Sequence, residues 1–303
     1  MKNIKTITIG ISAFNEEQTI GALLDSIAIQ TGDSFLLEKI IINLDGSTDN
    51  TKKVITDRKD ELVTIIDNKI QKGKATRLNE LYQMNKSDVL IILDADITIT
   101  DQRFIAKLIS GFTHQNIAIV SSNNQPIKPK TFIGKIWYAN EQSWYEIRKD
   151  VNNGNNLYNN SGCAVALEKN FTKSIVMPKE AIADQQFVYL SAMKQNKQFV
   201  FKENAVVYYL PPANLHDIKI QFARSLGEEK FLKQYFDERY DIYFKIPTKA
   251  KLKGLWNAFI TDPFYTILSR IFLFILPKLG IEEDENNKKG LWKRTNSTKK
   301  LIN

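Results

Sequence analysis

Short apolar runs alternate with amphipathic stretches along the first 121 residues, and this alternation restricts the fold more than any other feature of the sequence. The apolar runs predict strands over residues 6–13, 39–44, 62–67, 88–94 and 117–121. The stretches between them have helical spacing, as in Ile20, Leu23 and Ile27. Apolar strands that alternate with helices are typical of a parallel sheet covered on both faces. We therefore predict an α/β fold with a mostly parallel, Rossmann-like sheet and helices on both faces.

Acidic and amide side chains follow four of the predicted strands. They are Asn15, Glu16 and Glu17 after the first strand, Asp45 after the second, Asp67 after the third, and Asp94 and Asp96 after the fourth. In such sheets ligands bind outside the carboxyl ends of the strands. Carboxylates gathered at that edge repel one another unless a cation or a ligand compensates their charge. The sequence therefore predicts a ligand site there.

Asp94 and Asp96 are one residue apart at the end of an apolar run. If the backbone stays extended, their side chains leave on the same side, because side chains alternate along a strand. Mg²⁺ and Mn²⁺ prefer such oxygen ligands and usually share them with the phosphates of a substrate. An acidic turn after a strand is the alternative interpretation.

The second half of the chain is less regular. It predicts helices over 137–149, 182–194 and 215–236, strands over 162–167, 199–202 and 205–209, and an Asn/Gly-rich loop over 152–160. At 303 residues the chain is long enough for one large domain with an appendage. We predict a domain over 1–240, divided at 125/126 into two halves (1–125 and 126–240), an amphipathic helical segment over 241–280 and a charged tail over 281–303.

The composition favours a cytoplasmic protein at a membrane surface. One cysteine, Cys163, excludes an internal disulfide framework, and residues 1–8 lack the features of a signal peptide. Residues 255–279 are rich in large apolar side chains, but Asp262, Arg270 and Pro277 interrupt them, so a membrane span is not expected. A helix lying in the cytoplasmic membrane interface fits the basic residues around it. Packing on the protein's own core or on a second subunit is the alternative.

Four stretches, in this order and spacing, resemble the family 2 glycosyltransferases with the GT-A fold. They are Ile-Gly-Ile-Ser-Ala-Phe-Asn-Glu-Glu at 9–17, Asp-Gly-Ser-Thr-Asp-Asn-Thr at 45–51, Lys-Gly-Lys-Ala with Leu-Asn at 72–79, and Leu-Asp-Ala-Asp at 93–96. Ser12 stands where the family has Pro, and Leu44 where it has a first acid before Asp-Gly-Ser. The resemblance implies an inverting enzyme that moves a sugar from a nucleoside diphosphate, usually UDP, to an acceptor hydroxyl, such as one on a lipid-linked or cell-envelope glycan. Mn²⁺ or Mg²⁺ is the implied cofactor.

The resemblance also assigns roles to individual positions. Ala13, Asn15, Glu17, Asp45, Lys74 and Asp94 match nucleotide-binding positions, Asp96 the metal ligand, Asp184 the general base, and Gly162, Gln221 and Arg224 positions at the acceptor or diphosphate. A base is needed because a sugar hydroxyl is a poor nucleophile while it holds its proton. A helix N-cap is the alternative for Asp184. Ser225 replaces the Trp of the processive members, so a single addition is the favoured reaction.

Two other functions agree with parts of the sequence. A nucleotidyltransferase also combines an α/β sheet with acids and a cation, but it has a Gly-rich loop after the first strand, where this chain has no glycine before Gly21. A catalytically idle scaffold that binds a nucleotide sugar agrees with the altered motifs. The net charge of +8 permits nucleic-acid binding through the basic tail, but the acidic sheet edge has the wrong sign for that partner.

Overall fold

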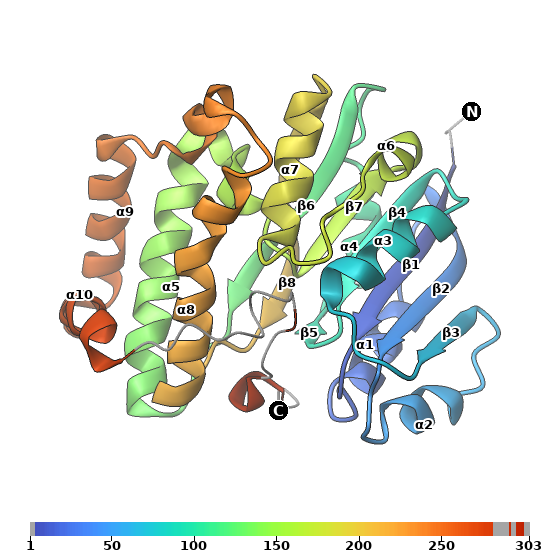
Figure 1. Cartoon of the computed structure of the whole chain (residues 1–303), viewed down its shortest axis with the longest axis horizontal. Helices are drawn as coiled ribbons and strands as arrows, with labels where there is room; N and C mark the ends of the chain where they lie inside the picture. The colour runs from blue at the N-terminus through green and yellow to red at the C-terminus, as the bar shows by residue number, and fades with distance from the viewer. Residues whose placement is uncertain (1–3, 281–290, 292–294, 300–303) are drawn as a thin grey trace.

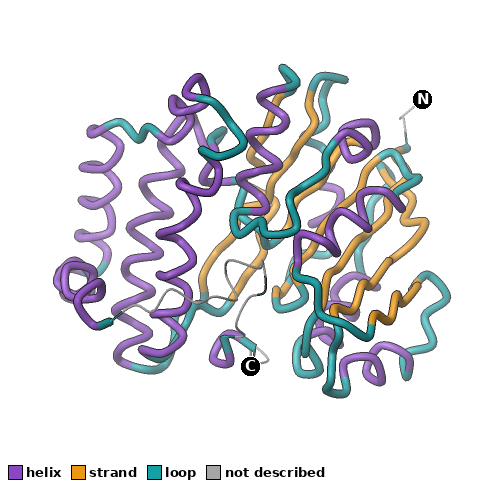
Figure 2. Tube along the Cα trace, in the orientation of Figure 1, coloured by secondary structure: helices purple, strands orange, loops and turns teal. Residues whose placement is uncertain are grey.

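An eight-stranded mixed sheet with the strand order β3-β2-β1-β4-β7-β6-β8-β5 forms the centre of the computed structural model, which describes residues 4–280, 291 and 295–299 (Figures 1 and 2). The strands are β1 Lys5–Ala13, β2 Phe35–Asp45, β3 Val63–Asn68, β4 Val89–Asp94, β5 Ile97–Thr98, β6 Ile117–Pro126, β7 Ala164–Glu168 and β8 Gln198–Tyr209. Most of the predicted charged tail, 281–303, lies outside the described residues.

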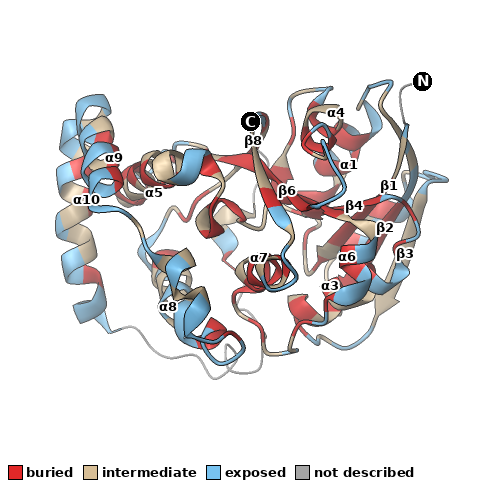
Figure 3. Cartoon of the chain, turned by 90° about the horizontal axis from the view of Figure 1, so that it is seen from above, coloured by how far each residue is buried: buried red, intermediate tan, exposed pale blue. Residues whose placement is uncertain are grey.

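Helices cover both faces of this sheet (Figure 3). They are α1 Ile20–Ala28, α2 Thr51–Thr56, α3 Lys74–Met84, α4 Phe104–Ile109, α5 Phe132–Asp150, α6 Lys169–Ser174, α7 Asp184–Lys194, α8 Leu215–Leu232, α9 Thr248–Thr261 and α10 Pro263–Ile275. Short 3₁₀ helices are η1 Val151–Gly154, η2 Leu157–Asn159, η3 Glu238–Phe244, η4 Leu276–Leu279 and η5 Asn296–Thr298.

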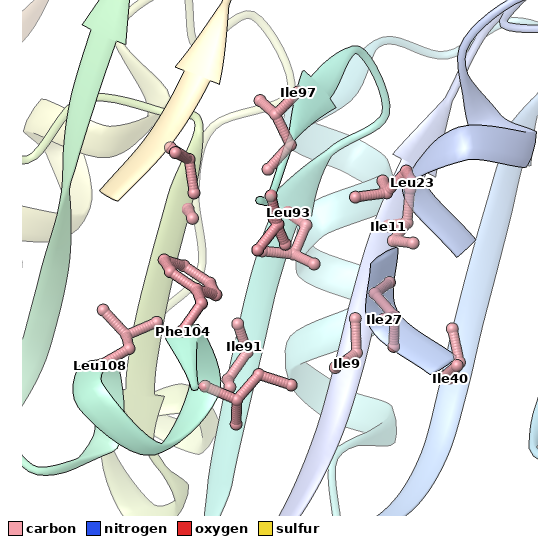
Figure 4. Close-up of a cluster of buried hydrophobic side chains, with 14 of the residues drawn as sticks. Ile9, Ile11, Leu23, Ile27, Ile40, Ile91, Leu93, Ile97, Phe104 and Leu108 are labelled. Atoms are coloured by element: carbon pink, nitrogen blue, oxygen red, sulfur yellow. The ribbon is translucent and has the colours of Figure 1, made fainter. Parts of the chain in front are cut away.

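Alternate residues of the central strands build two cores. On one face Ile91 and Leu93 of β4 pack with α1 and α4, as Figure 4 shows around Leu23 and Phe104. On the other face Leu90 and Ile92 pack with α3 and α7. Because each strand buries both faces, its sequence is a continuous apolar run, and each fully buried Ile or Leu contributes about 1.5–3 kcal/mol. The predicted α/β fold with helices on both faces is confirmed.

Strand direction differs between the two halves of the sheet. β1, β2, β3 and β4 pair in parallel, as do β6 and β8, whereas β7 runs antiparallel to both β4 and β6. β5 pairs antiparallel with β8. The chain leaves β1 toward β2 on one side and returns to β4 on the other, so the strand order reverses beside β1. A crevice at the carboxyl ends of the strands is expected at such a point.

Three predictions from the second half are wrong in detail. The two short strands predicted over 199–202 and 205–209 form one strand, β8, whose pairing with β6 shifts between Ser122 and Asn123. The predicted loop over 152–160 contains η1 and η2, because the Asn156 side chain donates to the carbonyls of Arg148 and Val151. The helix predicted to reach residue 236 ends at Leu232.

The apolar segment near the C-terminus is two helices rather than one. α9 ends at Thr261, and the Asp262 carboxylate accepts the backbone N–H of Tyr265 and so starts α10. Both helices lie beside α5 at the end of the molecule remote from β3 (Figure 1). Among the described residues, no helix combines the length and apolar character that crossing a membrane requires.

Candidate active site

A cavity of about 300 Å³ opens at the carboxyl ends of β1, β2 and β4. Its lining includes six of the residues predicted for the site, namely Asp45, Lys74, Asp94, Asp96, Gln221 and Arg224. They come from β2, α3, the end of β4 and α8, so the fold brings together positions more than 170 residues apart in the sequence. The volume lies at the lower end of the range of small-molecule sites.

Lys74 connects two of the predicted carboxylates. Its Nζ lies 2.8 Å from Oδ1 of Asp94 and 3.1 Å from Oδ2 of Asp184. Burial opposes the charge on Lys74, but the carboxylates of Asp184 and Asp94 outweigh it and raise the pKa of the ammonium. Because Lys74 opens α3 and Asp184 opens α7, this ion pair joins the two halves of the domain at the cavity.

Gly162 lies against the same ion pair. A Cβ at this position would stand 3.3 Å from Oδ2 of Asp94 and 3.3 Å from Nζ of Lys74. The neighbouring Cys163 carbonyl accepts the backbone N–H of Asp94 at 2.9 Å, which fixes the start of β7 beside the end of β4. Burial raises the pKa of the Cys163 thiol, so this cysteine is a neutral lining residue.

A second cation lies between two further carboxylates. Nζ of Lys299 lies 2.5 Å from Oε1 of Glu16 and 2.8 Å from Oδ2 of Asp96. Burial raises the pKa of Asp96, but the Lys299 ammonium outweighs burial and lowers that pKa overall. Burial is the largest influence on Glu16 and raises its pKa to about 7, although Lys299 opposes the shift. In this corner of the cavity the Lys299 ammonium therefore compensates the charge of the two carboxyl groups.

Three predicted nucleotide-binding residues do not line the cavity. Ala13 is buried in the core at 2% exposure. The Asn15 Oδ1 accepts the backbone N–H of Thr48, and Oε2 of Glu17 accepts that of Asn50, so both side chains hold the turn after β2. In their place, the end of β1 contributes Ser12 to the lining, and the loop after it contributes Phe14 and Glu16. The nucleotide role of Ala13, Asn15 and Glu17 stays a prediction.

Asp45 is buried at 3% exposure and organises the loop before α3. Its carboxylate accepts the backbone N–H groups of Lys72 and Gly73 at 2.8 and 2.9 Å and Nε of Arg77 at 2.6 Å. Arg77 is itself fully buried and is a residue that the sequence did not single out. The structure thus gives Asp45 a structural task at the cavity wall, and its contact with a nucleotide base stays a prediction.

Helix α8 supplies Gln221 and Arg224 to the cavity lining, and it also carries Glu228, a carboxyl group that the sequence did not indicate. Burial and the Asp184 carboxylate raise the pKa of Glu228 to about 8, and Arg224 opposes the shift. Glu228 follows Arg224 by one helical turn, and that spacing was the only available signal. Lys299 had no signal at all, because it belongs to a tail without a motif.

The residues present suit a divalent cation shared with a substrate. In the part of the chain that the structure describes, no three His, Cys, Asp or Glu side chains form a ready-made metal site. Glu16 and Asp96 nevertheless hold the ammonium of Lys299 between them, so their oxygens already surround a positive charge. Mn²⁺ and Mg²⁺ commonly complete their coordination with substrate phosphates and water. Asp96 and Glu16 therefore fit such a cation.

The mixed sheet, the crevice beside β1 and the acidic pair at the end of β4 define a glycosyltransferase domain of the GT-A class, and solved structures support this fold. A mannosyltransferase from Pyrobaculum calidifontis, solved with GDP-Man and Mn²⁺, superposes with a TM-score of 0.59 at 17% identity, covering 91% of this chain and 76% of that one. Staphylococcus aureus TarS (residues 1–349), solved with UDP, gives 0.53 at 14% identity, covering 94% and 89%. Glucosyl-3-phosphoglycerate synthase from Mycobacterium tuberculosis, solved with Mn²⁺ and UDP, also gives 0.53, at 17% identity, covering 76% and 79%.

The chain belongs to glycosyl transferase family 2, because the sequence model of that family matches residues 8–175. Among curated proteins, poly-β-1,6-N-acetyl-D-glucosamine synthase of S. aureus (strain COL) is 31% identical over 135 residues, which is 44% of this chain. The same synthase from Staphylococcus epidermidis is 26% identical over 136 residues, or 45% of this chain. The matched stretch spans about a third of the length of these relatives, 32% in both.

Proposed function

We propose that this protein is a metal-dependent inverting glycosyltransferase that moves a sugar from a UDP-sugar to a hydroxyl of a lipid-linked or cell-envelope glycan. The observation that carries the proposal is that Asp94, Asp96 and Lys74 line one cavity and that Lys74 also forms an ion pair with Asp184, which itself lies behind the cavity lining. The activities of the relatives, among them synthesis of poly-β-1,6-N-acetyl-D-glucosamine, support the reaction class and a glycan acceptor.

The donor binds with its diphosphate at the Asp96 corner of the cavity. Asp96 and Glu16 would hold Mn²⁺ or Mg²⁺, which when bound would supply positive charge to stabilise the leaving diphosphate. Arg224 lines the same cavity and is positioned to bind phosphate oxygens with its guanidinium group. Asp94, fixed by Lys74, is placed to accept hydrogen bonds from the ribose or the donor sugar.

Asp184 serves as the general base. Its buried carboxylate, fixed by Lys74, takes the proton of the acceptor hydroxyl while the oxygen attacks the anomeric carbon. The attack comes from the face opposite the leaving diphosphate, so one displacement inverts the configuration and no covalent sugar–enzyme intermediate forms. Gly162 leaves room for the reacting groups next to Asp94, because a side chain there would contact the ion pair.

A donor screen followed by a base variant tests this proposal. Thermal shift with UDP-glucose, UDP-N-acetylglucosamine and GDP-mannose, each with MnCl₂, identifies the donor, because a ligand bound only by the folded state raises the melting temperature. We then expect Asp184→Asn to lower the transfer rate by about 10²–10⁴-fold with unchanged UDP affinity. Asp57→Asn, which changes an exposed carboxylate at the C-cap of α2, is the matched control and should transfer at the wild-type rate. A rate for Asp184→Asn within a few-fold of wild type would show that the base is another group.

The same assays separate the two alternative functions. Calorimetric binding of UDP with Mn²⁺, without hydrolysis or transfer of any donor sugar, supports a catalytically idle scaffold. Release of inorganic pyrophosphate from a nucleoside triphosphate and a sugar phosphate supports a nucleotidyltransferase. Turnover of a nucleotide sugar with release of UDP supports the proposed transferase.

We also propose that α9 and α10 bind the surface of an anionic membrane, with the enzyme at the cytoplasmic face. These helices bury small residues, since Gly254 packs directly on Ile147 of α5, and they expose large ones. The exposed side chains, 50–70% accessible, are Leu252, Trp256, Ile260, Phe264, Ile267, Ile271 and Phe274. Residues 245–278 contain six basic residues and one acid, so the surrounding charge suits anionic head groups.

Cosedimentation with vesicles tests the membrane proposal. The protein should sediment with phosphatidylcholine–phosphatidylglycerol vesicles and stay in solution with phosphatidylcholine alone. Replacing Trp256 and Phe274 together by Ser should abolish sedimentation, whereas Leu36→Ser with Val176→Ser, which removes exposed apolar side chains elsewhere, should not. Absence of sedimentation for the wild type would refute the proposal. A dimer that the first double variant dissociates would assign the face to a second copy of the chain.

A further inference from the structure

The C-terminal strap, defined here as residues 295–299, contributes to the lining of the cavity although it is 199 residues from the Leu-Asp-Ala-Asp motif at 93–96. Thr295, Thr298 and Lys299 contribute to the lining (η5 in Figure 1). Ser297 fixes the strap to α8: its backbone N–H and Oγ both donate to Oδ2 of Asp217, at 2.8 and 2.5 Å. Asp217 is buried at 2% exposure in the first turn of α8.

The strap ends on the carboxylates that the proposed function assigns to the metal. Lys299 Nζ lies 2.5 Å from Oε1 of Glu16 and 2.8 Å from Oδ2 of Asp96. A divalent ion on those oxygens would lie next to the ammonium, and two cations in a partly buried site repel strongly. The carboxylates of Glu16 and Asp96 therefore accept Lys299 or a metal ion, but not both.

Each of the two cations satisfies the same chemical need. Glu16 is 5% exposed, and besides Lys299 its carboxylate accepts a hydrogen bond from Thr19 Oγ1, which carries no charge. Without a cation between them, the carboxylates of Glu16 and Asp96 would repel each other. With Lys299 in place the site is neutralised without metal or substrate. When the strap withdraws, a divalent ion takes over the same oxygens and leaves its remaining positions for phosphate. When a divalent ion replaces the Lys299 ammonium, the two carboxylates keep a compensating positive charge.

We propose that residues 295–299 form an autoinhibitory strap in which the Lys299 ammonium occupies the place of the divalent cation, so that the strap must leave before metal and donor bind. The proposal rests on the proposed function for the identity of the metal ligands. The affinity of the enzyme for the metal ion then increases when the strap leaves its position beside α8.

The affinity of the full chain for Mn²⁺ tests the strap directly. It is measured with and without UDP from the electron paramagnetic resonance signal of the unbound ion. If the strap is docked in about 90–99% of molecules, its release raises the apparent affinity by roughly 10–100-fold. We expect this gain from Lys299→Ala, which removes the competing charge, and a smaller one from Ser297→Ala, which keeps that charge but removes the hydroxyl's hydrogen bonds to Asp217 and Ala213. Lys245→Ala, an exposed lysine with the same loss of charge, should bind Mn²⁺ as the wild type does.

Two results would overturn the strap. In the first, Asp96→Ala abolishes Mn²⁺ binding but both strap variants bind Mn²⁺ with wild-type affinity. The metal would then bind at Asp96 without competition from Lys299. The other is weaker UDP binding by Lys299→Ala with no gain for Mn²⁺, which would make Lys299 a diphosphate ligand. Failure of the proposed function appears elsewhere, as UDP binding by the wild type without transfer or hydrolysis of any donor sugar, whatever the Mn²⁺ affinities are.

Discussion

Lys74 places one ammonium between carboxylates from the two halves of the chain, Asp94 at the end of β4 and Asp184 at the start of α7. In Lys74→Met these carboxylates remain close without their shared cation. Because Lys74 is 20% exposed and water screens part of the loss, we expect destabilisation by about 1–3 kcal/mol in urea unfolding. Lys52→Met, which removes a surface ion pair with Asp67, should cost under about 1 kcal/mol. Equal costs for the two variants would contradict this role of Lys74.

Glu228 makes stability depend on pH in a defined direction. Burial and Asp184 raise its pKa from 4.5 to about 8 in the folded protein. The protonated form is therefore favoured by folding, so the contribution of Glu228 is complete below pH 4.5 and disappears as the pH rises to about 8. Glu228→Gln should gain stability relative to wild type between about pH 5 and pH 8.5, by on the order of 1–2 kcal/mol after solvent screening. A pH-independent difference in unfolding free energy would rule out the raised pKa.

At the scale of elements, the turn between β2 and α2 depends on one glycine. Gly46 has φ +76°, and a Cβ there would lie 2.8 Å from the backbone N of Gln71. Gly46→Ala should cost about 1–3 kcal/mol in unfolding free energy, because it combines backbone strain with a backbone clash. Gly280→Ala, at φ +69° with nothing within 4 Å, isolates the strain and should cost less. If the two substitutions lower the free energy of unfolding equally, the contact between Gly46 and residues 70–71 does not contribute to stability.

Elements of the first half were predictable to within a few residues, because strands buried on both faces have continuous apolar sequences. β4, expected over 88–94, is Val89–Asp94. The direction of β7 was not predictable, since Ala164–Glu168 has the same apolar character in either direction. The pairing shift that joins two expected strands into β8 depends on β6, which local sequence does not reveal. The break at Asp262 was visible only as one polar residue in an apolar segment.

At the scale of the whole molecule, the site combines three regions that are far apart in the sequence. Motif residues Lys74, Asp94 and Asp96 were predictable because the carboxyl ends of parallel strands share one edge. The sequence could not predict that the side chains of Asn15, Glu17 and Asp45 hold loops in place. Each accepts hydrogen bonds from backbone N–H groups of a distant loop, and only the folded structure brings these groups together. Lys299 reaches Asp96 across 203 residues, and only tertiary structure reveals such a contact.

The most direct test of this site is a crystal of the full chain soaked with UDP and MnCl₂ and measured at the manganese absorption edge. We predict an anomalous peak that joins Oδ of Asp96 to the diphosphate of UDP, with Lys299 displaced from both Glu16 and Asp96. A nucleotide bound elsewhere, or a manganese peak remote from Asp96, would contradict the account.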